Sequence, residues 1–173
     1  MSDARWNEVE EDVTDAILHF SMAVRMHEDN DGDQISLCEY AAYKDNMALM
    51  HAMQCGYMSF ENAMLRILDM LQEQAPTGES WHRDLVSRVS KALNDRPAIL
   101  DPRIAAAANT TRSFRNLAGR GYRTFDVDRC APAIAAARVM INGLSEAITE
   151  FRQSVDRPSN ESKDDDEGTN CGF

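Results

Sequence analysis

The sequence predicts an all-α protein whose helices form one bundle. Apolar residues recur at steps of three and four along most of the 173-residue chain, and no segment shows the alternation of a β-hairpin. Glycine and proline are sparse, and hydrophobic residues make up 43% of the composition. A chain of this length buries one sizeable core but is short for two independent domains. We therefore expect one helical domain over residues 1–157 and a short tail over residues 158–173.

The first predicted helix is amphipathic, and its first half is acidic. Glutamate and aspartate crowd residues 8–15 and mostly lie away from the apolar face. That face carries Trp6, Val9, Val13, Ala16, Phe20 and Ala23. Residues 27–34, HEDNDGDQ, are polar and rich in turn formers, so we predict a loop there.

A long second helix is predicted from about residue 37 to residue 71. Gly56 lies in its middle, so we expect the helix to bend or break there. Six methionines lie in this segment, at positions 47, 50, 53, 58, 64 and 70. Such a set is compatible with a soft metal site or a flexible groove, but methionine at helical spacing is more typical of a core.

Two capping patterns mark the next helices. Ser80 follows a loop with proline and glycine and is predicted to cap a short third helix. The apolar face of that helix carries Trp81, Leu85, Val89 and Ala92. Asp101 and Pro102 are typical of an N-cap and a first-turn proline, so a fourth helix is predicted to begin there.

The last predicted helix carries a regular apolar seam. Its members follow alternating steps of four and three: Cys130, Ile134, Ala137, Ile141, Leu144, Ile148, Phe151 and Val155. Such a seam packs against neighbouring helices or against a second subunit. The acidic tail after Pro158 has almost nothing to bury and is predicted to be disordered.

Charge and cysteine usage narrow the function classes. A net charge of −11 argues against nucleic-acid binding by the whole surface, so any RNA contact requires a local basic patch. The four cysteines form no C-x-x-C pair, which makes a disulfide framework or structural zinc site unexpected and favours a reduced, cytoplasmic protein. No signal peptide and no apolar stretch of the roughly 20 residues that a membrane span needs is visible.

Residues 103–123 reverse the charge of the chain. They contain arginines at positions 103, 112, 115, 120 and 123 and no acidic residue. On a helix, Arg112, Arg115 and Arg123 fall on or near one face, and Arg120 lies beside it. Guanidinium groups suit bidentate contacts with phosphate. Alternatively, these arginines pair with the acids of the first helix or stabilise a helix C-terminus.

The segment FRNLAGRGYRTFDVD, residues 114–128, resembles the signature of HEPN proteins of the HepT kind. That signature has an arginine followed by a polar residue, then a histidine, then a tyrosine two positions later. Arg115, Asn116 and Tyr122 match it, and Arg120 occupies the histidine position. Segments 56–65, 78–85 and 96–100 also resemble family landmarks in the family's order, so the resemblance covers roughly residues 37–155.

The resemblance implies a HEPN-type bundle of four to five helices that forms a homodimer, with two motif copies in one cleft. Active relatives cleave RNA without a metal or cofactor, and many are toxins neutralised by a nucleotidyltransferase antitoxin, which in some cases transfers AMP to the motif tyrosine. Carried over, Arg115 contacts the scissile phosphate, Asn116 orients it, and Tyr122 accepts the modification. Arg112 and Arg123 are predicted to hold further phosphates.

Arg120 puts the chemistry of this motif in question. Metal-independent cleavage needs a group that takes the proton of the 2′-hydroxyl, and arginine has no acceptor atom with which to do so. It is suited only to stabilising negative charge in the transition state. His82 could reach the cleft from the third helix, but a Trp-His pair at a helix start is more typical of packing and capping.

Three functions therefore stay open from the sequence. The first is a toxin component that binds and cleaves RNA and is neutralised by a nucleotidyltransferase. The second is a catalytically silent member that acts as a binding module or as an AMPylation target through Tyr122. The third is an oligomerisation bundle in which the motif occurs by chance, and the acid-free arginine stretch argues against it.

Overall fold

The computed structural model describes residues 4–32, 39–93, 96–118 and 130–156. These residues form helices α1 (Ala4–Gly32), α2 (Glu39–Met70), α3 (Trp81–Val89), α4 (Pro102–Ala118) and α5 (Ala131–Asp156). Within the described ranges there is no β-strand. The predicted all-α bundle is thus confirmed, and the predicted tail lies outside the described residues.

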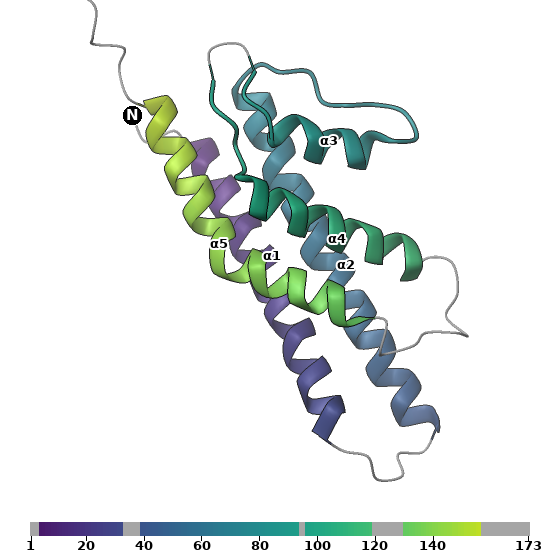
Figure 1. Ribbon diagram of the computed structural model, residues 1–173. Helices are drawn as coiled ribbons and strands as arrows, with labels where there is room; N and C mark the ends of the chain where they lie inside the picture. The colour runs from purple at the N-terminus through teal and green to yellow at the C-terminus, as the bar shows by residue number, and fades with distance from the viewer. Residues whose placement is uncertain (1–3, 33–38, 94–95, 119–129, 157–173) are drawn as a thin grey trace, which may run out of the picture.

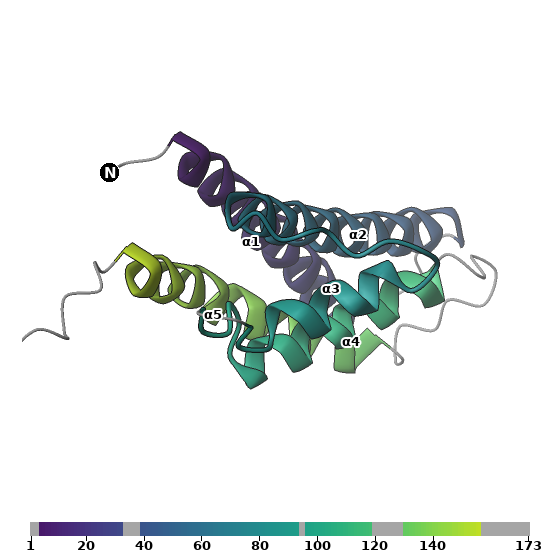
Figure 2. The same ribbon diagram turned by 90° about the horizontal axis from the view of Figure 1, so that it is seen from above.

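The helices pack as a bundle with one short addition. The two longest helices, α1 and α2, lie side by side, α5 runs along α1, and α4 packs between α5 and α2 (Figures 1 and 2). The short α3 covers α4 and one end of α2. All five helices contribute to one core, whose largest fully buried side chains include Phe20, Tyr57 and Phe60.

The methionines of α2 fall into two groups. Met50, Met53 and Met64 are buried, which confirms the core interpretation for these three. Met47 and Met70 are only partly buried, and Met58 is 50% exposed. The methionines therefore fill the core on one side of the helix and reach its surface on another.

The predicted loop after the first helix was wrong for residues 27–32, because α1 continues to Gly32. Ion pairs hold this polar end of the helix. Arg25 and Asp29 pair within α1 with their charged atoms 3.9 Å apart, and Arg138 of α5 donates to Glu28 at 2.5 Å. A helix end without an apolar face is thus stabilised by charge pairing within α1 and with α5.

The predicted break at Gly56 was also wrong, since α2 is continuous through this residue. A Cβ atom at position 56 would lie 2.9 Å from the ring of Phe20 on α1. The glycine therefore allows a close approach of α1 and α2, which is the other common reason for glycine inside a helix.

The two predicted N-caps behave differently. The carboxylate of Asp101 accepts the backbone N–H groups of Arg103 at 2.6 Å and Ile104 at 2.9 Å, which confirms the N-cap of α4. Ser80 precedes α3, but its hydroxyl donates to Asp84 at 2.6 Å and caps no backbone group. This hydrogen bond holds the pKa of Asp84 below its usual value. Because α3 ends at Val89, Ala92 lies beyond the helix.

The seam of α5 packs against α4 and α1 of the same chain. Most of its members are buried, whereas Ile141 is partly buried and Val155 is 36% exposed. At Gly143, between two seam positions, a Cβ atom would lie 2.6 Å from Cδ1 of Ile104. Neighbouring helices therefore account for the seam.

A buried ion pair joins the two loops that flank α3. The guanidinium of Arg96, with a side chain only 7% exposed, donates to both carboxylate oxygens of Glu73, one of them at 3.0 Å. It also donates to the backbone carbonyls of Lys91 at 3.1 Å and Pro97 at 3.0 Å. This clamp ties the loop before α3 to the loop after it.

The Glu73–Arg96 clamp predicts a loss of stability in acid. Hydrogen bonding to Arg96 lowers the pKa of Glu73, so its contribution is complete above the unfolded-state pKa and is lost as pH falls through the folded-state pKa. Urea unfolding between pH 7 and pH 3 should show a smaller pH dependence for Glu73→Gln than for the native chain. Equal pH dependence in the two proteins would contradict the clamp.

The close approach of α1 and α2 at Gly56 predicts that a larger residue there lowers the stability of the protein. Gly56→Ala should destabilise the protein by about 1–3 kcal/mol, because the added methyl group meets a buried ring, even though alanine favours helices by about 1 kcal/mol. Urea unfolding measures this cost. Combining it with Phe20→Leu should give less than the sum of the two single losses, and strict additivity would show that the two residues do not meet.

Candidate functional site

The predicted site begins on α4, whose inner face anchors it in the bundle. Buried residues recur along this face at helical spacing: Ile104, Ala107, Ala108, Thr111 and Phe114. The small alanines let α4 pack closely between α5 and α2. The direction of α4, and with it the arginines it carries, is therefore set by core packing.

The arginines of α4 do not share one face. Arg103 and Arg112 are nine residues apart, so at about 100° per residue they point to opposite sides of the helix. Arg103 is exposed and lies against Gly143 of α5. Arg112 is half-buried, and its Nε donates to the side-chain oxygen of Asn109 at 3.4 Å. Arg103 thus lies outside the predicted phosphate-binding face.

Several acids of α1 have other partners. Glu8 and Asp12 bind Arg66 of α2, the latter at 2.7 Å, and Glu10 binds Arg152 of α5 at 2.6 Å. Among the side chains that the structure describes, neither Arg103 nor Arg112 forms an ion pair. The alternative that these two arginines neutralise the acidic first helix is therefore not supported.

The motif residues lie at the end of α4 and beyond it. Arg115 and Asn116 belong to the last turns of α4, for which the structure describes the backbone. Arg120, Tyr122 and Arg123 lie outside the described residues. Their roles, and those of Arg115 and Asn116, stay predictions.

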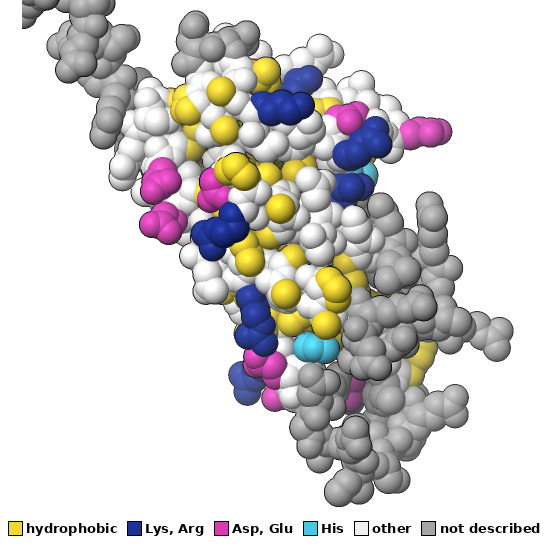
Figure 3. All heavy atoms as spheres, in the orientation of Figure 1, with side chains coloured by type: hydrophobic (Ala, Val, Ile, Leu, Met, Phe, Trp, Pro, Cys, Tyr) yellow, Lys and Arg dark blue, Asp and Glu magenta, His cyan; other side chains and the backbone are white. Residues whose placement is uncertain are grey.

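The beginning of α3 lies on the same side of the molecule as the last turns of α4 (Figures 1 and 2). There, Nδ1 of His82 donates to the carboxylate of Glu61, a residue of α2 whose side chain is only 4% exposed. The ring of Trp81 stacks on that of His82 with centroids 3.7 Å apart. Lysine and arginine side chains are scattered over the face of the molecule that Figure 3 shows. His82 thus has the packing role that the Trp-His pair predicted.

Glu61 was missed by the sequence interpretation, although a signal for it exists. It lies on the inner face of α2, four residues after Tyr57, three before Met64 and seven before Leu68, all of them buried. A carboxylate at such a position requires a partner, because an unpaired buried charge is strongly destabilising. The periodicity could therefore have identified Glu61 as one half of a buried pair.

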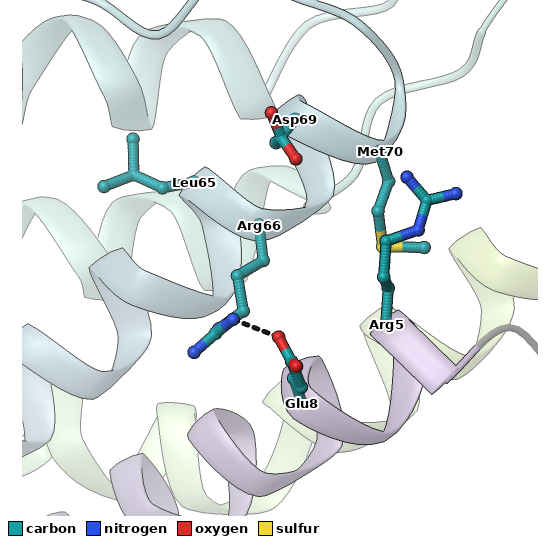
Figure 4. Close-up of a pocket in the computed structure, with 6 residues that line it drawn as sticks. All are labelled: Arg5, Glu8, Leu65, Arg66, Asp69 and Met70. Atoms are coloured by element: carbon teal, nitrogen blue, oxygen red, sulfur yellow. Dashed lines mark hydrogen bonds and ion pairs between the residues drawn. The ribbon is translucent and has the colours of Figure 1, made fainter.

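A hollow of about 280 Å³ lies elsewhere, between the first turns of α1 and the last turns of α2 (Figure 4). Its lining consists of Arg5, Glu8, Leu65, Arg66, Asp69 and Met70. The hydrogen bond to Asp12 and the nearby acids raise the pKa of Arg66, which is already engaged. The hollow contains none of the predicted site residues.

The described residues show no candidate metal cluster and no candidate membrane span. No group of three or more histidine, cysteine, aspartate or glutamate side chains in them is arranged to hold a metal ion. None of the helices described is both long and apolar enough to cross a membrane.

The Glu61–His82 pair predicts that alanine substitutions at two neighbouring positions of α2 lower the free energy of unfolding by different amounts. Glu61→Ala should lower the free energy of unfolding by about 2 kcal/mol, because it removes a buried partner of a histidine that keeps some access to water. Asn62→Ala, at the next and exposed position, should change it by less than about 0.5 kcal/mol. Urea unfolding of both variants measures the difference, and equal effects would contradict the pair.

A family model described as "HepT-like protein" matches residues 48–155, from the first third of α2 to the last turn of α5. No curated protein and no solved structure matches the chain. Since the matched region is well over half of the chain, the protein belongs to the family of HepT-like proteins.

Proposed function

We propose that this protein is the toxin component of a toxin–antitoxin pair and acts on RNA through the end of α4. The observation that carries the proposal is the family match over residues 48–155, which includes the whole acid-free arginine stretch. In a chain with a net charge of −11, that stretch is the part best suited to phosphate.

The proposed reaction is an intramolecular transesterification that cleaves the RNA backbone. The 2′-hydroxyl loses its proton to water as its oxygen attacks the neighbouring phosphorus. The bond to the 5′-oxygen breaks, this oxygen takes up a proton from water, and a cyclic phosphate and a 5′-hydroxyl result. Arg115 binds the phosphate, Asn116 orients it, Arg112 and Arg123 hold adjacent phosphates, and Arg120 stabilises the charge that develops. Without a histidine base, turnover should be slow, since loss of a general base typically costs about 10²- to 10⁴-fold.

The proposed assembly follows from the family resemblance. Two copies of the chain form a homodimer in the cytoplasm, and the two motifs share one cleft. A nucleotidyltransferase-type antitoxin neutralises the toxin, with Tyr122 as the acceptor of AMP. The role of Tyr122 is open to direct test, because Tyr122→Phe removes the acceptor oxygen and keeps the ring.

A second candidate function is a catalytically silent HEPN protein that serves as a binding module or AMPylation target. One observation favours it, namely that Arg120 stands where the family has its histidine. Arginine cannot accept the proton of a 2′-hydroxyl. In this case the dimer cleft and Tyr122 would keep their roles without cleavage.

RNA cleavage by purified protein separates these functions. The native chain, Arg115→Ala, Arg120→His and Arg103→Ala are incubated with total RNA, with and without a chelator, and the products are resolved on gels. Arg103→Ala is the matched control, because Arg103 lies on the opposite side of α4 from Arg112. We expect slow cleavage by the native chain, loss of cleavage in Arg115→Ala and no change in Arg103→Ala.

The other possible results of this experiment decide between a silent protein and the absence of a nuclease site. Cleavage by Arg120→His alone would establish the silent alternative, because it would show a competent cleft that lacks only its base. Absence of cleavage by all four proteins, or equal cleavage by all of them, would contradict a nuclease site at the end of α4.

A further inference from the structure

The charges of the chain are divided between its first helix and the pair of helices α3 and α4. Helix α1 carries eight acidic residues and two arginines, whereas residues 80–118, which include α3 and α4, carry seven lysines or arginines and three acidic residues. Helices α3 and α4 pack on each other and on α2, and their contacts with α1 are few. The acidic and the basic helices therefore lie in different parts of the bundle.

The outer face of α3 carries cationic side chains. The three buried residues of α3 lie on its inner face. By helical register, Arg83 and Arg88 lie away from that face, and Lys91 follows in the turn after the helix. The side chain of Arg83 is 65% exposed, Lys91 is exposed, and Arg88 is half-buried. The outer face of α3 is thus basic and open to solvent.

The contacts of these arginines with the protein leave room for a phosphate. Nε of Arg83 lies 3.6 Å from Oδ1 of Asp84, and an exposed ion pair of this kind holds its members only weakly. The carboxylate of Asp84 also accepts the hydroxyl of Ser80 at 2.6 Å. Arg88 donates one N–H group to the backbone carbonyl of Gln74, and a guanidinium has five N–H donors. Both arginines can therefore bind an anion from solvent.

Arg112 connects this face with the proposed site on α4. Arg103 lies against α5, and Arg112 points to the opposite side of α4. Because α4 lies between α5 and α2 and is covered by α3, Arg112 is on the side where α2 and α3 pack. Arg83 belongs to the beginning of α3, which lies on the same side of the molecule as the last turns of α4 (Figures 1 and 2). The cations of α3 thus continue the proposed phosphate-binding surface of α4.

We propose that the outer face of α3, with Arg83, Arg88 and Lys91, binds the phosphate backbone of RNA next to the cleavage site at the end of α4. The inference rests on the proposed function and adds where the strand beyond the cleaved bond is held. Contacts with phosphate fix the position of a strand without reading its bases. RNA matches the charge of this face, whereas the acidic α1 repels it.

The probe for the test is a labelled oligouridylate whose 2′-hydroxyl groups are methylated, so that it binds but is not cleaved. Fluorescence anisotropy measures its affinity for the full chain at several salt concentrations. We expect Arg83→Gln with Lys91→Gln to lower the slope of log affinity against log salt concentration by about 1.4, and to weaken binding at least about tenfold near 0.1 M salt. The variant with Arg83→Lys and Lys91→Arg keeps both charges and should keep the native affinity.

The matched control combines Arg25→Gln with Lys44→Gln. It also removes one arginine and one lysine from exposed positions, but on α1 and α2. It should change the affinity by less than about twofold, because salt screens distant charges. Equal losses in the control and in the glutamine variant of α3 would overturn the inference, since RNA would then respond only to net charge.

The remaining outcomes separate this inference from the proposed function. Weakened binding in the variant that keeps both charges would overturn the inference, because the effect would then be structural. Native affinity in the glutamine variant of α3, together with weakened binding in Arg115→Ala, would overturn the inference and leave the proposed function standing. Absence of binding by the native chain would contradict the proposed function itself, and the inference with it.

Discussion

The close crossings of the helices, made possible by glycine, are the constraint on which the rest of this structure depends. At Gly56 the backbone of α2 meets the ring of Phe20, and at Gly143 the backbone of α5 meets Ile104 of α4. A side chain at either position would push the helices apart. Because α4 is fixed by its contacts with α5 and α2, these crossings also determine where the arginine stretch begins and in which direction it runs.

A buried ion pair and a buried hydrogen bond hold α3 where apolar packing alone is not sufficient. With nine residues, α3 is shorter than the 12–15 residues or so that an isolated helix needs for even marginal stability in water. Its three buried side chains, Leu85, Val86 and Val89, are supplemented by the pair of Glu61 with His82 at its start. The Glu73–Arg96 pair fixes the loops on both sides. Packing thus holds the long helices, whereas polar side-chain pairs help to position the short one.

Local and periodic signals explain what the sequence could predict. The N-cap at Asp101, the core methionines and the seam of α5 depend on residues within a few positions of one another, and all were predicted. The end of α1 and the role of Gly56 depend on Arg138 and Phe20, residues distant in the sequence. Glu61 was missed because periodicity reveals a buried position but not its partner. The motif itself was identified by resemblance and not by periodicity.

The proposed function places RNA binding on one side of α4, and the salt dependence of RNA affinity tests that claim most directly. Each phosphate contact contributes about 0.7 to the slope of log affinity against log salt concentration for single strands. Arg115→Ala should reduce this slope by about that amount, and Arg103→Ala should leave it unchanged. Equal reductions in the two variants would contradict the account, because RNA would then respond to overall charge and not to the predicted face.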